Sequence, residues 1–201
     1  VVVDGVFIGA NSGAMLKALD LQSVEILRGP QGTLFGRNSI AGVINVTRQR
    51  PQTEFGGGLR LGYGNYDDKQ LDGYVNIPMG EQFAFKISGA YRDRDGYFDN
   101  LTLGQESGEM EYKSISPSLM WRPSDSLEFY YRYDDSQQDQ DANTVQNMAQ
   151  PGQVFCFFYE QCAQGVTTPQ SGDRYDVLQN GDRHDSFFDS EMHIFNARWD
   201  I

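Results

Sequence analysis

The feature that most constrains the fold is a change of pattern at Gly56-Gly57-Gly58. After these glycines, apolar and polar residues alternate with a period of two in six segments, at residues 59–64, 70–77, 83–92, 114–121, 127–134 and 194–201. Successive side chains of a strand point to opposite faces, so each segment predicts a strand with one apolar and one polar face. Their repetition predicts an antiparallel sheet.

The predicted strands are joined by connections of two kinds. Pro78–Glu81 and Pro123–Asp125 are tight turns, whereas residues 92–113 and 136–190 form long connections. Short turns on one side and long loops on the other are typical of transmembrane β-barrels of outer membranes, where the short turns are periplasmic. We therefore expect antiparallel transmembrane β-barrel strands with a long extracellular loop at 136–190.

Composition narrows the class of protein further. The formal net charge of -12 argues against binding to nucleic acid, which requires clustered Lys and Arg. The sequence has no run of about 18 apolar residues, which excludes a membrane-spanning helix but not barrel strands. Aromatic residues near the predicted strand ends indicate either an interfacial girdle or ordinary strand propensity. They are Tyr63, Tyr66, Tyr91, Tyr97, Trp121, Tyr133 and Trp199.

The first fifty residues follow a different pattern. Residues 1–8 predict a strand broken by Asp4-Gly5, residues 15–21 a short helical turn, and residues 23–27 and 42–47 two more strands. Frequent glycines between short elements favour a small, partly α/β unit. We expect one domain at 1–51 and a second, built from the alternating strands, at 52–201.

Residues 24–46 carry a distinctive order of elements. They read VEILRGPQGTLFGRNSIAGVINV and are followed by the basic run TRQR. This segment, with Val3-Asp4-Gly5-Val6 upstream, resembles the end of the plug domain of TonB-dependent outer-membrane receptors. Asp95-Gly96-Tyr97 and the Trp121-to-Ser124 turn resemble early barrel segments of the same family. The resemblance implies a mixed fold, a partial α/β plug followed by an incomplete β-barrel.

The resemblance also implies a function and partners. Neither end looks like a natural terminus, and a plugged barrel has about 22 strands, so we expect a fragment of a longer protein. Such receptors lie in the outer membrane of Gram-negative bacteria, surrounded by lipid, and take up a scarce nutrient. The nutrient is often a ferric siderophore and otherwise cobalamin or a glycan. TonB drives uptake by binding a segment that would precede Val1.

Candidate site residues come from the plug. By the resemblance, Asn11 and Ser12 lie in a loop at the plug apex that faces the ligand, although a simple turn is an equally good interpretation. The chain has no Lys or Arg between Arg132 and Arg174, so the candidate donors to an anionic ligand are Arg37 of the plug or loops outside this chain. Glu25 and Arg28 are candidates for contacts between plug and barrel, with a solvated face as the alternative.

The cysteines and histidines of the chain do not indicate a catalytic or metal-binding function. Cys156 and Cys162 favour a small loop disulfide in an oxidising compartment over a metal pair. His184 and His193 are isolated, and no catalytic arrangement is recognisable. We therefore expect no enzyme, no metal site and no cofactor. A passive porin-like barrel is the main alternative, but it gives residues 24–46 no role, and a soluble β-protein would have to cover its apolar strand faces with protein.

Overall fold

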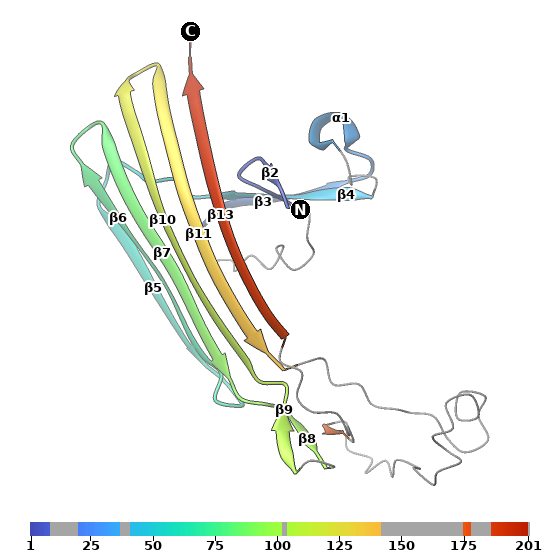
Figure 1. The fold of residues 1–201 in the computed structure, drawn as a ribbon. Helices are drawn as coiled ribbons and strands as arrows, with labels where there is room; N and C mark the ends of the chain where they lie inside the picture. The colour runs from blue at the N-terminus through green and yellow to red at the C-terminus, as the bar shows by residue number, and fades with distance from the viewer. Residues whose placement is uncertain (9–19, 37–40, 102–103, 142–174, 178–185, 201) are drawn as a thin grey trace.

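The computed structural model describes residues 1–8, 20–36, 41–101, 104–141, 175–177 and 186–200. A long curved sheet dominates the chain, and a smaller sheet stands off its concave side (Figure 1). We call the six-stranded sheet the wall, and the small sheet with its connections the plug sheet. The two are joined by residues 49–55.

The plug sheet has the strand order β2-β1-β4-β3. It contains β1 (Val2–Val3), β2 (Val6–Phe7), β3 (Leu21–Arg28) and β4 (Gly42–Arg48). The predicted break at Asp4-Gly5 is a tight hairpin turn with φ of 48° and 84°, the conformation that Asp-Gly favours in two-residue hairpins. β1 pairs in parallel with β4, and β3 pairs with β4 antiparallel.

The helical component of the plug is smaller than the sequence indicated. Among the described residues the helix is α1 (Gly32–Phe35), a single turn between β3 and β4. The helical turn expected at 15–21 falls mostly outside the described residues. Its last residue, Leu21, begins β3 because it pairs with Arg48 across the sheet. The described plug is thus a sheet with one helical turn, and the α/β expectation is met only in its β part.

The wall is an antiparallel meander in the order β13-β11-β10-β7-β6-β5. Its strands are β5 (Gly56–Tyr63), β6 (Lys69–Met79), β7 (Phe83–Arg94), β10 (Met110–Ser124), β11 (Leu127–Gln140) and β13 (Ser186–Trp199). All six predicted strands are present. The described sheet has free edges at β5 and β13 and is not a closed barrel.

The two faces of the wall differ as the alternation predicted. Even-numbered side chains face the plug sheet, and the fully buried ones include Ala84, Lys86, Met120, Tyr130 and Ile194. Odd-numbered side chains form the opposite, outward face. Its exposed apolar members include Leu59, Leu61, Leu71, Val75, Ile77, Ile115, Leu119, Trp121, Phe195 and Trp199. The pairing register keeps these residues together, as in Leu61 with Leu71 and Ile77 with Phe85.

The connections gather by length at the two ends of the wall (Figure 1). Residues 80–82 and 125–126 form tight turns at the turn end. Residues 64–68, the described parts of the connection at 95–109, and Asp141 and β12 (Asp176–Val177) of the third connection lie at the other end, the loop end. The second of these contains β8 (Phe98–Asn100) and β9 (Gln105–Ser107), which pair with each other, and β12 adds to β8.

The long connection is shorter than the predicted 136–190. β11 continues to Gln140 and β13 already begins at Ser186, where the two strands pair Gln140 with Ser186. Residues 134–140 are polar on both faces, so the alternation ends there while the backbone pairing continues. The connection at 92–113 is also shorter than predicted, since β7 reaches Arg94 and β10 begins at Met110. In the described ranges, no helix has the length and apolar character needed to cross a membrane.

Candidate functional site: the interface between plug sheet and wall

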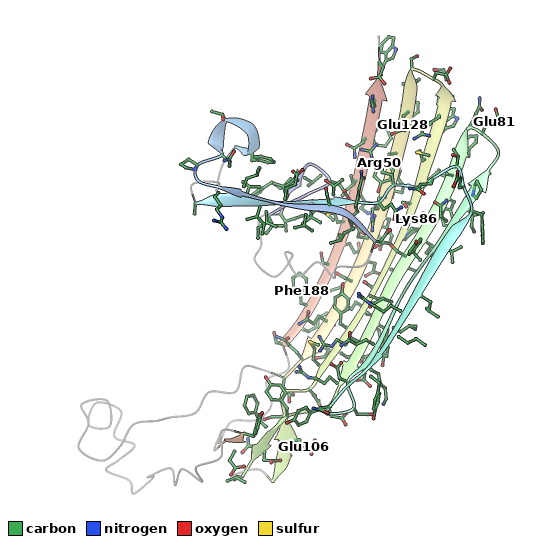
Figure 2. The ribbon with its side chains drawn as sticks, turned by 180° about the vertical axis from the view of Figure 1, so that it is seen from behind. Arg50, Glu81, Lys86, Glu106, Glu128 and Phe188 are labelled. Atoms are coloured by element: carbon green, nitrogen blue, oxygen red, sulfur yellow. The ribbon has the colours of Figure 1, made fainter. Side chains whose placement is uncertain are left out.

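The plug sheet meets the wall at one end of its two long strands (Figure 2). β4 arrives at the wall with Arg48, and β3 leaves it at Leu21, directly after Asp20. At the opposite end of this hairpin Arg28 pairs with Gly42, beside α1 and away from the wall (Figure 1). The interface is therefore made by the wall-side ends of β3 and β4 and by the Asp4-Gly5 turn.

Arg48 joins the plug sheet to the wall. Its Nη1 and Nη2 atoms donate to Oδ1 and Oδ2 of Asp134 in β11, both at 2.7 Å. Its Nε donates to Asp4 Oδ2 at 2.9 Å, and Asp4 Oδ1 accepts from the Arg48 backbone N–H at 2.8 Å. Arg48 is 6% exposed. Paired, parallel bonds of this kind fix geometry as well as adding energy, because both groups are planar and charged.

The two carboxylates keep Arg48 charged in spite of its burial. Burial lowers the pKa of the Arg48 guanidinium, but the hydrogen bonds and negative charges of Asp134 and Asp4 outweigh it and raise that pKa above its ordinary value. Asp134 is also held by neighbouring side chains of the wall. Its Oδ1 accepts from Ser116 Oγ of β10 at 2.5 Å and from Arg132 Nε of β11 at 3.0 Å.

A second buried ion pair lies beside the first. Asp20 of the plug forms an ion pair with Lys86 of β7, and the two side chains are 1% and 2% exposed. Lys86 Nζ also donates to the Gln49 carbonyl at 3.2 Å and lies 4.7 Å from the centre of the Tyr74 ring. Arg132 Nη1 is 3.9 Å from Asp20 Oδ2. Asp20 has a φ of 66°, a left-handed conformation that Asp tolerates better than most residues.

Together these residues form a neutral cluster. Three cations face three carboxylates: Arg48, Lys86 and Arg132 with Asp4, Asp20 and Asp134. A buried ion pair adds little net stability, but losing one partner is costly because a charge is left without compensation. We call these six residues the latch. Such an interface positions the plug sheet against the wall in one arrangement. The plug sheet can still separate from the wall when water solvates the charges.

A further set of contacts fixes the chain as it passes from plug sheet to wall. Arg50 Nη1 donates to Glu128 Oε1 at 2.7 Å, and the Arg50 guanidinium lies over the Tyr130 ring at 4.8 Å. Asn76 of β6 donates to the carbonyls of Gln52 and Glu54, and its Oδ1 accepts from the Gln52 N–H. Figure 2 shows Arg50, Lys86 and Glu128 on the face that the plug sheet approaches.

Only two of the predicted site residues lie in the described part of the chain. Glu25 is exposed in β3 and accepts from Asn45 Nδ2 at 3.0 Å, while the Arg28 carbonyl accepts from Gln31 Nε2. The contacts described above between plug sheet and wall involve other side chains, so the role proposed for Glu25 and Arg28 stays a prediction. Asn11, Ser12, Arg37, Cys156 and Cys162 lie outside the described residues.

The sequence did contain a signal for the latch. Lys86, Arg132 and Asp134 are charged residues at even positions of alternating strands, the face that turns toward the plug sheet. Arg48 and Arg50 belong to the basic run that closes the plug motif. What the sequence did not indicate is which charges pair. Within the described residues, no group of three or more His, Cys, Asp or Glu side chains is arranged to hold a metal ion.

Comparison with known proteins agrees with this geometry. Residues 1–43 match the family model of the TonB-dependent receptor plug domain. The ferrioxamine receptor of Yersinia enterocolitica is 29% identical over 112 residues, which are 56% of this chain and 15% of the receptor. The vitamin B12 transporter of Vibrio vulnificus is 28% identical over 100 residues, 48% of this chain and 16% of the transporter. The chain thus spans about 15% of the length of these curated relatives.

Solved structures show the same fold. The ferric yersiniabactin uptake receptor of Yersinia pestis superposes with a TM-score of 0.57 and 26% identity, over 61% of this chain and 20% of the receptor. The plug sheet and the antiparallel wall thus resemble a part of that receptor. More particularly, the match to the plug domain confirms the resemblance to the TonB-dependent outer-membrane receptor family.

Proposed function

We propose that this chain forms the C-terminal part of the plug and the first wall strands of a TonB-dependent receptor that takes up a ferric siderophore across the outer membrane of a Gram-negative bacterium. Residues 1–51 belong to the plug and residues 52–201 to the transmembrane wall. The loop end faces the outside and the turn end the periplasm. Uptake is driven by TonB.

The latch carries this proposal. A plug that has to move during each uptake cycle is poorly served by a large apolar interface with the barrel wall. Burial of apolar side chains is non-directional, so it does not specify one position of the plug against the wall. The latch instead uses directional charged contacts such as Arg48–Asp134 and Asp20–Lys86. Their net contribution is small, yet they specify one seated position. This is the behaviour required of a plug that is displaced and then returns.

The outward face supports the placement in a membrane. It is apolar over the middle of the wall, and aromatic side chains occur toward both of its ends. Phe83, Trp121 and Phe129 stack in a row near the turn end, with ring centres 5.7 and 5.3 Å apart. Aromatic belts at both interfaces and an apolar band between them are expected of a lipid-facing barrel wall.

The relatives support the choice of cargo. Those that resemble this chain include a ferrioxamine receptor and a ferric yersiniabactin uptake receptor, and both names refer to iron-carrying compounds. Cobalamin is the second candidate because a vitamin B12 transporter is also similar. A glycan receptor is the remaining alternative of the same fold. A passive porin-like barrel is disfavoured, since an open channel has no use for the latch.

The decisive experiment measures uptake in cells that lack the gene for the full-length protein. Uptake of radiolabelled iron from ferrioxamine and yersiniabactin complexes is compared with uptake of labelled cobalamin. We expect the full-length protein to restore iron uptake and to do so only when TonB and the inner-membrane proton gradient are intact. Restoration of cobalamin uptake alone would show that the transported compound is cobalamin and not a ferric siderophore. Uptake that persists without TonB would overturn the energised mechanism and favour a passive channel.

A further inference from the structure

An acidic cavity lies at the loop end of the wall, where β7 and β11 end and β10 begins (Figure 1). It has a volume of about 280 Å³ and is lined by residues 93–95, 109–111 and 139–141. Arg94 is the one cation among these described lining residues. Six of the nine carry carboxylates: Asp93, Asp95, Glu109, Glu111, Asp139 and Asp141. We call this cavity the rim pocket.

The carboxylates of the rim pocket lie opposite one another across the strands. Glu111 pairs with Asp93 on one side and with Asp139 on the other, so each of three adjacent strands places one carboxylate in the same row. One residue beyond the last pair of β10 and β11, the Asp141 N–H donates to the Glu109 carbonyl at 3.0 Å. Neighbouring strands are about 4.8 Å apart, and like charges directly opposite each other are destabilising. The row therefore gains free energy when cations bind beside it.

The cations of the chain do not balance this charge. Lys113 forms an ion pair with Glu111, and Lys69 forms one with Asp67, outside the cavity. When both lysines, Asp67 and Arg94 are counted with the pocket, seven carboxylates face three cations. The excess of negative charge disfavours an anionic ligand and favours a cationic one.

Asp141 presents an unsatisfied acceptor in this cavity. It is 8% exposed, and its Oδ2 accepts from the backbone N–H groups of Gly108 at 2.7 Å and of Glu109 at 3.3 Å. Its Oδ1 is buried and has no hydrogen-bond partner. Arg94 Nη2 donates instead to the Gly108 carbonyl, at 2.8 Å. A buried carboxylate oxygen without a donor is costly, so Oδ1 favours a ligand that brings a charged N–H group.

An organic cation fits the rim pocket better than a metal ion does. Among the described residues, no three carboxylates are arranged to hold a metal ion together. Carboxylates one strand spacing apart instead suit separate ammonium groups joined by short alkyl spacers. We propose that the rim pocket binds an aliphatic polyamine such as spermidine. One primary ammonium group donates to Asp141 Oδ1, and the remaining nitrogens lie along the row formed by Asp93, Glu111 and Asp139.

Calorimetric titration of the full-length protein in a non-ionic detergent tests this proposal. Spermidine and putrescine are compared with Mg²⁺, which carries the same charge as putrescine. We expect both amines to bind more tightly than Mg²⁺. Amide exchange should slow on spermidine binding at residues 93–95 and 139–141 and stay unchanged in the turn at 125–126.

Asp141→Asn is the decisive variant. It keeps the shape of the side chain and an acceptor for the Gly108 N–H, but it removes the charge and places an amide in the cavity. We expect it to weaken spermidine binding at least about tenfold. Asp125→Asn removes one charge from an exposed turn at the other end of the wall and should leave binding unchanged.

Three results would overturn the proposal. Unchanged spermidine binding in Asp141→Asn would show that Oδ1 is not the site. Equal weakening in Asp125→Asn would show that only the total charge matters. Mg²⁺ binding at least as tight as that of putrescine, and lost in Asp141→Asn, would show a metal site. Heat-modifiable gel mobility reports whether each variant is folded, and Asp139→Asn, at an exposed position, serves if Asp141→Asn does not fold.

The rim pocket goes beyond the proposed function and does not depend on it. It lies at the loop end, whereas the latch joins the plug sheet to the inner face of the wall. Iron uptake by the same variants keeps the two conclusions apart. Loss of the polyamine site with uptake intact removes only the rim pocket, and absence of iron uptake with selective spermidine binding removes only the cargo.

Discussion

Arg48 of the plug sheet and Asp134 of the wall form a bidentate ion pair, with both N···O distances at 2.7 Å. The two residues are 86 positions apart in the chain. Both belong to a cluster in which each buried cation lies beside a carboxylate, so the pair positions the end of β4 against β11.

Arg48→Met should loosen the plug strongly. It leaves Asp4 and Asp134 without their shared cation, and breaking a buried ion pair by removing one partner costs about 3–5 kcal/mol. The urea midpoint of plug unfolding, followed by a fluorophore on the plug of the full-length protein, measures the change. Arg198→Met is the control: Arg198 and its partner Asp200 are 70% and 59% exposed, so its removal should cost less than about 1 kcal/mol.

The Arg48–Asp134 pair should also show coupling in a double-mutant cycle. Asp134→Asn should lower the free energy of unfolding of the plug less in the Arg48→Met background than in the wild type. The difference should exceed about 1 kcal/mol, because the contact is already lost in that background. Strict additivity of the two substitutions would contradict the latch described above. The urea midpoint of plug unfolding is measured for the wild type, the two single variants and the double variant.

Asp20→Asn should open a leak around the plug. It removes the only carboxylate that the described structure places against Lys86, and leaves Lys86 and Arg132, both nearly inaccessible to solvent, as neighbouring cations. We expect a larger conductance of the full-length protein in planar bilayers and greater sensitivity of cells to large antibiotics. Asp125→Asn, in an exposed turn of the wall, should leave both unchanged. A sealed Asp20→Asn channel would show that the pair does not hold the plug.

Acid should loosen the connection between β5 and β6. Asp68 accepts from Arg92 Nε at 2.8 Å and from Arg92 Nη2 at 2.7 Å, and these hydrogen bonds lower the pKa of the Asp68 carboxyl. A carboxyl whose folded pKa is depressed contributes stability that is fully present above its unfolded pKa of about 3.9 and is lost as pH falls through the lower folded value. The protection factors of the amides of residues 64–68, which compare observed exchange with the intrinsic rate at each pH, should therefore fall in that acidic window. Asp68→Asn should exchange faster at neutral pH and respond less to acid.

Trp121 and Trp199 should report contact with lipid. Trp121 is 40% and Trp199 72% exposed, both on the outward face near the turn end. Brominated lipids quench tryptophans that they contact, so reconstitution of the full-length protein in such lipids should reduce the fluorescence contributed by each. The contribution of each ring is the difference between wild type and its Trp→Phe variant. Equal fluorescence in brominated and ordinary lipid would place this face against protein or water.

The sequence by itself determined the wall. Strict alternation after Gly58 defined six strands and the outward apolar face, because a strand allows a side chain only two directions. It also determined the plug motif and the turn at Asp4-Gly5, whose conformation those two residues favour. Where alternation ended, as in the polar residues 134–140, the sequence no longer indicated that β11 continues to Gln140.

The tertiary structure decided which charges form the site. Lys86 meets Asp20 across 66 residues and Arg48 meets Asp134 across 86, and no local pattern encodes such pairings. The sequence offered Glu25 and Arg28 as plug contacts, and that role stays a prediction. The antiparallel hairpin of β3 and β4 places Arg28 at the end away from the described wall and Arg48 at the end against it. The contact with these wall strands depends on the direction in which the hairpin docks, which no local sequence pattern encodes.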